Sequence, residues 1–241
     1  MRHGKASFAA MVAPLLGGLF AHGCAATPPP NRREPPAAGP RVVDFAAGVR
    51  LDYRVPQVEI DARVILREGP IELLLYSKAP VPKEHESILL TDAPAESVYY
   101  ALGLIGLRPG RPPRYDDATG RVLPATGDEV EVRVRYARDG RMFEHPAADW
   151  LLDIAASHPP TDLRWVFAGS GRDAGGRYLA NLEGTTITVV DFESAVVAPA
   201  ASHSSANESL WLQAQREAIP PVGTAVTVLL RPACGPAASR Q

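Results

Sequence analysis

The sequence predicts an α+β domain, mainly antiparallel β-sheet with one or two helices packed on it; an all-β sandwich is the alternative. Two observations support this fold class. Most of residues 41–232 consists of short alternating or β-branched segments bounded by Gly or Pro. Residues 92–110 instead carry apolar side chains at helical spacing.

The segment "DEVEVRVRY", residues 128–136, is the clearest strand. Its two faces alternate, with Val130, Val132, Val134 and Tyr136 on one and Glu129, Glu131, Arg133 and Arg135 on the other. This pattern predicts a half-buried antiparallel strand. Asp139-Gly140 supplies the turn of a hairpin that returns through "RMFEH".

Further strands are expected where β-branched and aromatic residues gather, at residues 49–53, 57–66, 70–77, 163–170, 177–182, 185–192 and 224–231. The segment 57–66 is expected to break at Asp61-Ala62. The segment 70–77 is expected to be more buried, because its apolar residues run on without alternation. A tight hairpin between 163–170 and 177–182 would explain the glycines between them.

Residues 92–110 predict the principal helix. The supporting residues are Val98, Ala101, Leu102 and Ile105 at helical spacing, Asp92 as a cap, Pro94 in the first turn, and Gly106 and Pro109 at the end. A second short helix is expected around residues 146–155, with Trp150 and Leu151 facing inward.

The N-terminus has the features of an export signal. Basic residues precede a largely apolar stretch that is too short and too interrupted to span a bilayer stably, so residues 1–23 are expected to be a signal peptide. The following "AHGC" resembles the lipobox of bacterial lipoproteins, which predicts lipidation of Cys24. Plain cleavage, an uncleaved anchor or a Cys24–Cys234 disulfide are the alternatives.

Residues 24–40 are rich in proline and poor in apolar side chains, which predicts a semi-extended tether, and residues 233–241 are expected to be a flexible tail. Lipid, tether and folded domain together predict an exported protein anchored at the cell envelope, on the periplasmic side or at the outer membrane. The membrane would then be a partner through the lipid anchor.

Charge and cysteine content narrow the function classes. Residues 1–23 hold two of the 25 basic residues and none of the 27 acidic ones, so the remaining chain has a net charge of −4. This mild acidity argues against nucleic acid as a partner. Apart from Cys24 a single thiol remains, which cannot hold an iron–sulfur cluster, and no cofactor is predicted.

The stretch "KEHES" is the candidate site that the sequence singles out: Lys83, Glu84, His85, Glu86 and Ser87. In a strand the first, third and fifth would share one side and the two glutamates the other. His85 is the natural general base or metal ligand near neutral pH. The alternative is a polar loop with solvated charges.

Weaker signals lie elsewhere. No spaced histidine motif is present, so a metal site would have to be assembled by the fold, with His85 and His145 as weak candidates. Ser170 lies in "FAGSGRDAGG", which is neither a P-loop nor a nucleophile elbow. Asn207 lies in "SHSSANESLW", whose hydroxyls suit turns as well as a sugar or peptide ligand.

Four stretches in order, "KEHESIL", "SVYYALGLIGLRPGRPP", "WVFAGSG" and "SSANESLWLQAQREAIPPVGT", resemble the YdjY-like domain of exported bacterial proteins, over about residues 56–231. The resemblance implies no established activity, cofactor or catalytic residue. It does imply that "KEHES" and "WVFAGSG" are distinctive of the domain. Two places depart from the family pattern: Asp191-Phe192 stands where an Asn-Phe pair is usual, and Ala198-Pro199 where Leu-Pro is frequent.

These observations predict a membrane-tethered envelope domain that binds a ligand or protein partner and is not an enzyme. An enzyme or metal-binding protein centred on His85, with Glu84, Glu86 and either Ser170 or Asn207 brought in by folding, is the first alternative. A purely structural envelope module is the second.

Overall fold

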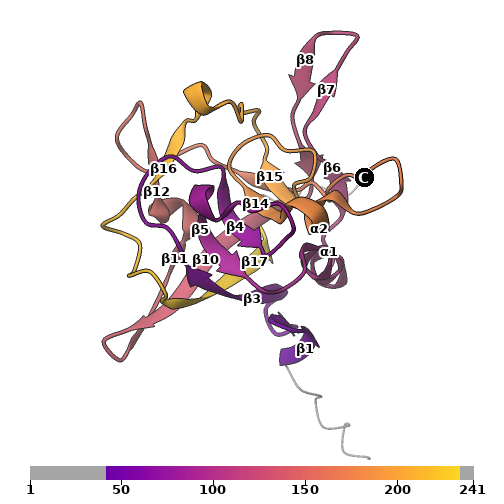
Figure 1. Ribbon diagram of the computed structural model, residues 1–241. Coiled ribbons are helices and arrows are strands. Elements are labelled where there is room, and N and C mark those ends of the chain that lie inside the picture. The colour runs from indigo at the N-terminus through magenta and orange to yellow at the C-terminus, as the bar shows by residue number, and fades with distance from the viewer. Residues whose placement is uncertain (1–41, 234–241) are drawn as a thin grey trace, which may run out of the picture. The chain divides into compact units, whose positions relative to one another are not determined.

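The computed structural model describes residues 42–233, which form a mainly β domain (Figure 1). Its centre is an eight-stranded mixed β-barrel with two short helices, and 42% of the described residues are in strands against 13% in helices. The expected fold is therefore confirmed in part: the domain is mainly β-sheet with two short helices, but its low helix content makes it a mainly β fold rather than α+β. The expected signal peptide, Cys24, the whole expected tether and residues 234–241 of the expected tail lie outside the described residues.

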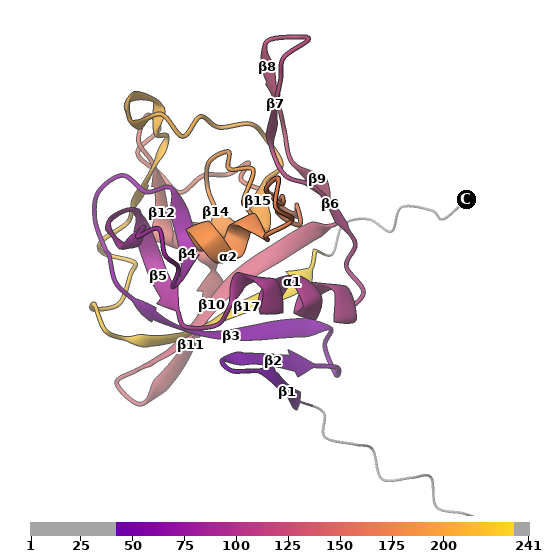
Figure 2. The ribbon, with the colours of Figure 1, turned by 45° about the vertical axis from the view of Figure 1, so that its right-hand side comes forward.

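The barrel strands, most of which are labelled in Figure 2, follow a closed order. They are β3 (Gln57–Val64), β17 (Ala225–Pro232), β10 (Glu129–Arg138), β13 (Trp165–Phe167), β15 (Val197–Pro199), β14 (Thr185–Thr188), β4 (Leu73–Ser77) and β5 (Ser87–Thr91). Pairing of β5 with β3, through Arg63↔Leu90 and Val64↔Leu89, closes the ring. This closure replaces the two separate sheets of the sandwich alternative.

Two pairings in the ring are parallel, β4 with β5 and β14 with β15, whereas the others are antiparallel. The expectation of antiparallel sheet is therefore only partly confirmed. Parallel neighbours require the chain to cross from one end of a strand to the other. Residues 78–86 make this crossover between β4 and β5, and they contain "KEHE".

Smaller elements surround the barrel. The strands are β1 (Val42–Ala46), β2 (Val49–Asp52), β6 (Pro109–Arg111), β7 (Arg114–Asp116), β8 (Arg121–Leu123), β9 (Thr126–Gly127), β11 (Arg141–Pro146), β12 (Leu151–Asp153) and β16 (Leu212–Ala214). The helices are α1 (Ala95–Leu104) and α2 (Leu179–Glu183), with 3-10 turns η1 (Glu84–Glu86), η2 (Ala147–Trp150) and η3 (Asn207–Ser209). The β7–β8 hairpin projects away from the barrel in both views (Figures 1 and 2).

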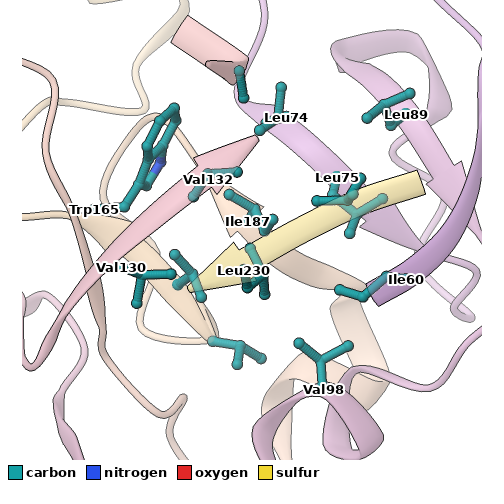
Figure 3. Packing of buried hydrophobic residues seen from close by; sticks show 14 of the residues in the cluster. Ile60, Leu74, Leu75, Leu89, Val98, Val130, Val132, Trp165, Ile187 and Leu230 are labelled. Carbon is teal, nitrogen blue, oxygen red and sulfur yellow. The ribbon is translucent and has the colours of Figure 1, made fainter. Parts of the chain in front are cut away.

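The core fills the barrel and extends under α1 (Figure 3). Buried side chains from opposite parts of the ring meet there, including Ile60, Leu75, Val132, Ile187 and Leu230. Val98 of α1 packs on the same cluster, and α1 contacts β2 and β3. The helix therefore covers one opening of the core rather than one face of an open sheet.

The strand β10 confirms the clearest sequence prediction. Its four apolar side chains are buried while the charged ones between them are more exposed, and it pairs antiparallel with β11 through the turn at Asp139-Gly140. The expected break at Asp61-Ala62 is wrong, because β3 runs on through both residues. The Asp61 carboxylate lies outside, 2.7 Å from the Arg50 guanidinium, so its charge does not interrupt the strand.

The principal helix is confirmed as α1, but its expected cap is not. Pro94 occupies the N-cap position without a side-chain cap, and the Asp92 carboxylate accepts a hydrogen bond from Arg63 at 3.2 Å instead. The second helix is only the 3-10 turn η2. Trp150 and Leu151 are buried, as expected.

The expected strand at residues 177–182 is wrong, since these residues form most of α2. The hairpin with 163–170 is also absent, because β13 pairs with β10 and β15. Tertiary contacts favour the helix: the Ala180 amide donates to the Ser170 hydroxyl at 3.1 Å, and the Tyr178 hydroxyl donates to the Gly169 carbonyl at 3.1 Å. Gly169 and Ser170, in the glycine-rich stretch, thus hold the first turn of α2 in place.

Candidate functional site

The "KEHES" segment forms the 3-10 turn η1 at the start of β5, not an extended strand. The turn places Lys83 beside Glu86, three residues later, with Nζ 2.6 Å from Oε1. The same ammonium lies 3.4 Å from Oε2 of Glu72, which precedes β4. We call these three residues the Lys83 network.

The Lys83 network is largely withdrawn from water. The side chains of Glu72, Lys83 and Glu86 are 8%, 14% and 17% exposed. Burial raises the pKa of Glu72, and the nearby Glu86 carboxylate raises it further. Burial lowers the pKa of Lys83, but its ion pairs with the two glutamates outweigh this, so the net shift is upward. Lys83 therefore stays charged and stabilises both carboxylates.

The other residues of "KEHES" divide between core and solvent. Ser87 is buried, and its hydroxyl donates to the Lys83 carbonyl at 2.5 Å, which holds the turn. The side chain of His85 is 76% exposed, with Nε2 3.6 Å from Oε2 of Glu86. Glu84 is exposed as well. The segment thus supplies a structural ion pair on one side and an outward-facing histidine on the other.

The remaining sequence candidates lie in other surroundings. His145 is on β11, with its ring centroid 6.1 Å from those of Tyr136 and Phe143. Ser170 accepts the hydrogen bond that begins α2. Asn207 opens η3. Within residues 42–233 no group of three or more His, Cys, Asp or Glu side chains is placed to hold a metal ion.

An apolar groove of about 450 Å³ lies between α1, β1, β6 and β13. It is lined by Phe45, Tyr99, Tyr100, Gly103, Leu104, Pro109 and Phe167. Tyr100 and Leu104, four residues apart on α1, are 50% and 53% exposed. Phe167 is buried at 0% exposure, and the Tyr99 ring packs edge-on to it with centroids 5.3 Å apart. The apolar groove therefore has a fixed aromatic interior and an exposed apolar rim.

A polar hollow of about 300 Å³ lies between the β7–β8 hairpin and the loops at residues 191–205. Asp191 lines it, with Oδ2 accepting a hydrogen bond from Ser202. Its other oxygen, Oδ1, is buried without a hydrogen-bond partner. Burial raises the pKa of the Asp191 carboxyl. Because Oδ1 has almost no accessible surface, this acceptor is not open to the hollow.

Sequence reasoning missed three features of these surfaces. Glu72 stands in the apolar run "PIELLLYS", and a carboxylate buried in a strand requires a partner, which was a usable signal. The helix α1 is apolar on more than its core face, at Tyr100 and Leu104, which indicates a second contact surface. Asp191 stands where the family pattern usually has an asparagine, and this residue lines the polar hollow.

The fold and these surfaces define a class of protein: a closed mixed β-barrel domain with two surface hollows and a buried ion-pair network. A family comparison identifies the domain further. Residues 49–231 match the YdjY domain, and the chain belongs to this family, whose function is unknown. The resemblance inferred from residue 56 onward is confirmed, and the match begins a little earlier. No curated protein and no solved structure matched the chain.

No helix of the described residues is long and apolar enough to cross a membrane.

Proposed function

We propose that this protein is a lipid-anchored extracytoplasmic domain that binds a protein partner through the apolar groove. The apolar groove is the observation that supports partner binding. Its lining is almost wholly apolar and its rim is exposed, whereas soluble domains rarely leave such contiguous surface without a use. A partner with an aliphatic or aromatic anchor side chain fits this chemistry.

The anchoring part rests on the sequence of residues 1–40. A basic and apolar leader, the "AHGC" motif and a proline-rich spacer support acylation of Cys24 and presentation of the barrel in the space beyond the membrane. Mass spectrometry of membrane-extracted protein tests it. We expect a diacylated or triacylated residue 24, and a Cys24→Ala variant that leaves the membrane fraction. An unmodified Cys24 in membrane-extracted protein would contradict the anchor.

The groove is tested by site-specific photo-crosslinking in cells that express the full chain. We expect a photoreactive residue at position 104 to give a discrete crosslinked band with one protein. Position 222 is a matched control, because Val222 is an exposed apolar residue, 62% accessible, outside the groove lining. Identical bands at both positions, or none at 104, would contradict binding in the groove.

The geometry gives less support to an enzyme or metal site centred on His85. A general base needs its partners free to face a substrate. Here Lys83 and Glu86 pair with each other, and His85 extends into solvent beside them. The Lys83 network instead supports a structural role for the cluster.

A further inference from the structure

The polar hollow has two different walls. One is the β7–β8 hairpin, on which Tyr115 and Val122 are directly opposite each other in the strand register. Tyr115 is 59% exposed and Val122 42%, so the hairpin offers an accessible ring beside an aliphatic side chain. The other wall carries carboxylates and hydroxyls, from Asp191 and Glu193 to Ser202, Ser204 and Ser205. An apolar platform thus faces a hydrogen-bonding surface.

The charge of the lining limits the ligand. Arg114 is its one cationic residue, against the carboxylates of Asp191 and Glu193. Like charges facing each other are unfavourable, so a phosphate or carboxylate ligand is disfavoured. The carboxylates require donors, while Arg114 supplies donors of its own and the serine hydroxyls can both donate and accept. A ligand with many neutral hydroxyl groups satisfies both demands.

The Asp191 carboxylate organises the polar wall of the hollow. Its Oδ2 is engaged by the Ser202 hydroxyl, and its backbone amide donates to the His203 carbonyl at 2.8 Å, so the residue is held in position. Its Oδ1 is left without a partner. Oδ1 has almost no accessible surface, so Asp191 acts on the hollow by holding the Ser202 hydroxyl in place rather than by offering this oxygen to a ligand.

We propose that the polar hollow binds a neutral saccharide. A pyranose ring has C–H faces that pack on an aromatic platform and hydroxyl edges that hydrogen-bond, which matches Tyr115 on one wall and Asp191 with the serines on the other. The volume of about 300 Å³ suits one or two sugar units of a longer chain. This site is separate from the apolar groove, since the two share no lining residue. The proposal therefore does not depend on the groove.

The test is a titration of the purified full chain, in detergent, with uncharged oligosaccharides: N-acetylglucosamine tetramer, maltotetraose and cellotetraose. Isothermal calorimetry is expected to show saturable binding of at least one of them. The Tyr115→Ala variant should weaken that binding about tenfold or more, because it removes the stacking platform. Tyr53→Ala is the matched control, since Tyr53 is also an exposed tyrosine, 53% accessible, outside the hollow lining, and it should bind as the wild type does.

Two further arms make the outcome decisive. Asp191→Asn, first checked for an unchanged melting temperature, should weaken binding; if the variant does not fold, Tyr115→Ala alone decides. An anionic probe, tetragalacturonate, should bind at least about tenfold more weakly than the best neutral sugar, because of the acidic lining. No binding of any neutral probe up to millimolar concentration would overturn the proposal. Tighter binding of the anion, or equal loss in Tyr53→Ala and Tyr115→Ala, would also overturn it.

Discussion

Replacing Lys83 by methionine tests the structural role of the "KEHES" segment. The substitution keeps the apolar stem of the side chain and removes the terminal ammonium, which leaves Glu72 and Glu86 facing each other at 8% and 17% exposure. Removal of one partner from a fully buried ion pair typically costs about 3–5 kcal/mol. The network is partly accessible, and the cation–π contact of Lys83 with the Phe192 ring, at 4.5 Å, is also lost. We expect a loss of about 2–3 kcal/mol in unfolding free energy.

Calorimetry and urea unfolding followed by circular dichroism measure this loss. For a domain of this size the melting temperature should fall by roughly 5–10 °C. Lys78→Met is the matched control, since Lys78 is an exposed lysine of the same crossover, and it should change stability by less than about 0.5 kcal/mol. Adding Glu72→Gln to Lys83→Met should restore part of the loss by removing the repulsion between carboxylates.

The pH dependence provides an independent check. Burial and Glu86 raise the pKa of Glu72, and a raised carboxyl pKa gives stability that is present at low pH and lost as pH rises. Lys83 opposes this rise, so its removal should raise the pKa of Glu72 further. The deficit of Lys83→Met relative to the wild type should therefore be smaller at pH 4.5 than at pH 7. A deficit equal to that of Lys78→Met, or one independent of pH, would refute the buried-network account.

Two other substitutions have expected outcomes in urea unfolding. Gly184→Ala should cost about 3 kcal/mol or more in unfolding free energy, since its Cβ would lie 2.2 Å from the Ser77 carbonyl oxygen. Gly140 has the same φ of +72° with open space around it, so Gly140→Ala should cost only about 1–2 kcal/mol. Equal losses in the two variants would contradict the steric argument. Asp52→Asn should lose about 1 kcal/mol at pH 7, since Arg54 lowers the pKa of Asp52 to about 2. A lowered carboxyl pKa gives stability that is present above its unfolded value, so this difference should vanish as pH falls from about 4 towards 2; a constant difference would contradict it.

The spacing of apolar residues predicted those elements whose buried face can be recognised within a single segment of the sequence. The alternation in β10 and the helical spacing of α1 each indicate a face that must pack, and both elements form as expected. Barrel closure was not predictable in this way, because it depends on the pairing of β3 with β5 and on two parallel pairings. The register between two distant strands produces no periodic pattern in the sequence of either strand. The same limit explains α2, whose first turn is held by a hydrogen bond from the Ala180 amide to the hydroxyl of Ser170, ten residues earlier.

The candidate site was located by residue type but not by geometry. Adjacent charges in "KEHES" drew attention to the correct segment, yet the 3-10 turn pairs Lys83 with Glu86, whereas a strand would have put them on opposite sides. Glu72, eleven residues before Lys83, joins only through the fold. The two hollows combine elements that are far apart in the chain, such as β1 with β13, and no motif marks such a combination.

The parallel pairing of β4 and β5 explains why two carboxylates meet in an otherwise apolar region. The pairing sets Leu73 opposite Ser87, so the preceding residues, Glu72 and Glu86, must lie side by side. The Glu72 amide also donates to the Glu86 carbonyl at 3.0 Å, which fixes their separation. Two buried carboxylates at this range cannot both ionise without a cation.

The crossover supplies that cation from within the same segment, because η1 turns Lys83 back over Glu86. The pairing of Lys83 with Glu86 in "KEHES" is therefore accounted for by the parallel pairing of β4 with β5. Glu84 and His85 are left over by this argument, because both are exposed and the ion-pair network makes no use of them. A ligand role for the segment would have to operate through these two residues, with His85 as the one suited to acid–base or metal chemistry. A His85→Ala variant with unchanged stability, next to an unstable Lys83→Met, would separate the two roles within one turn.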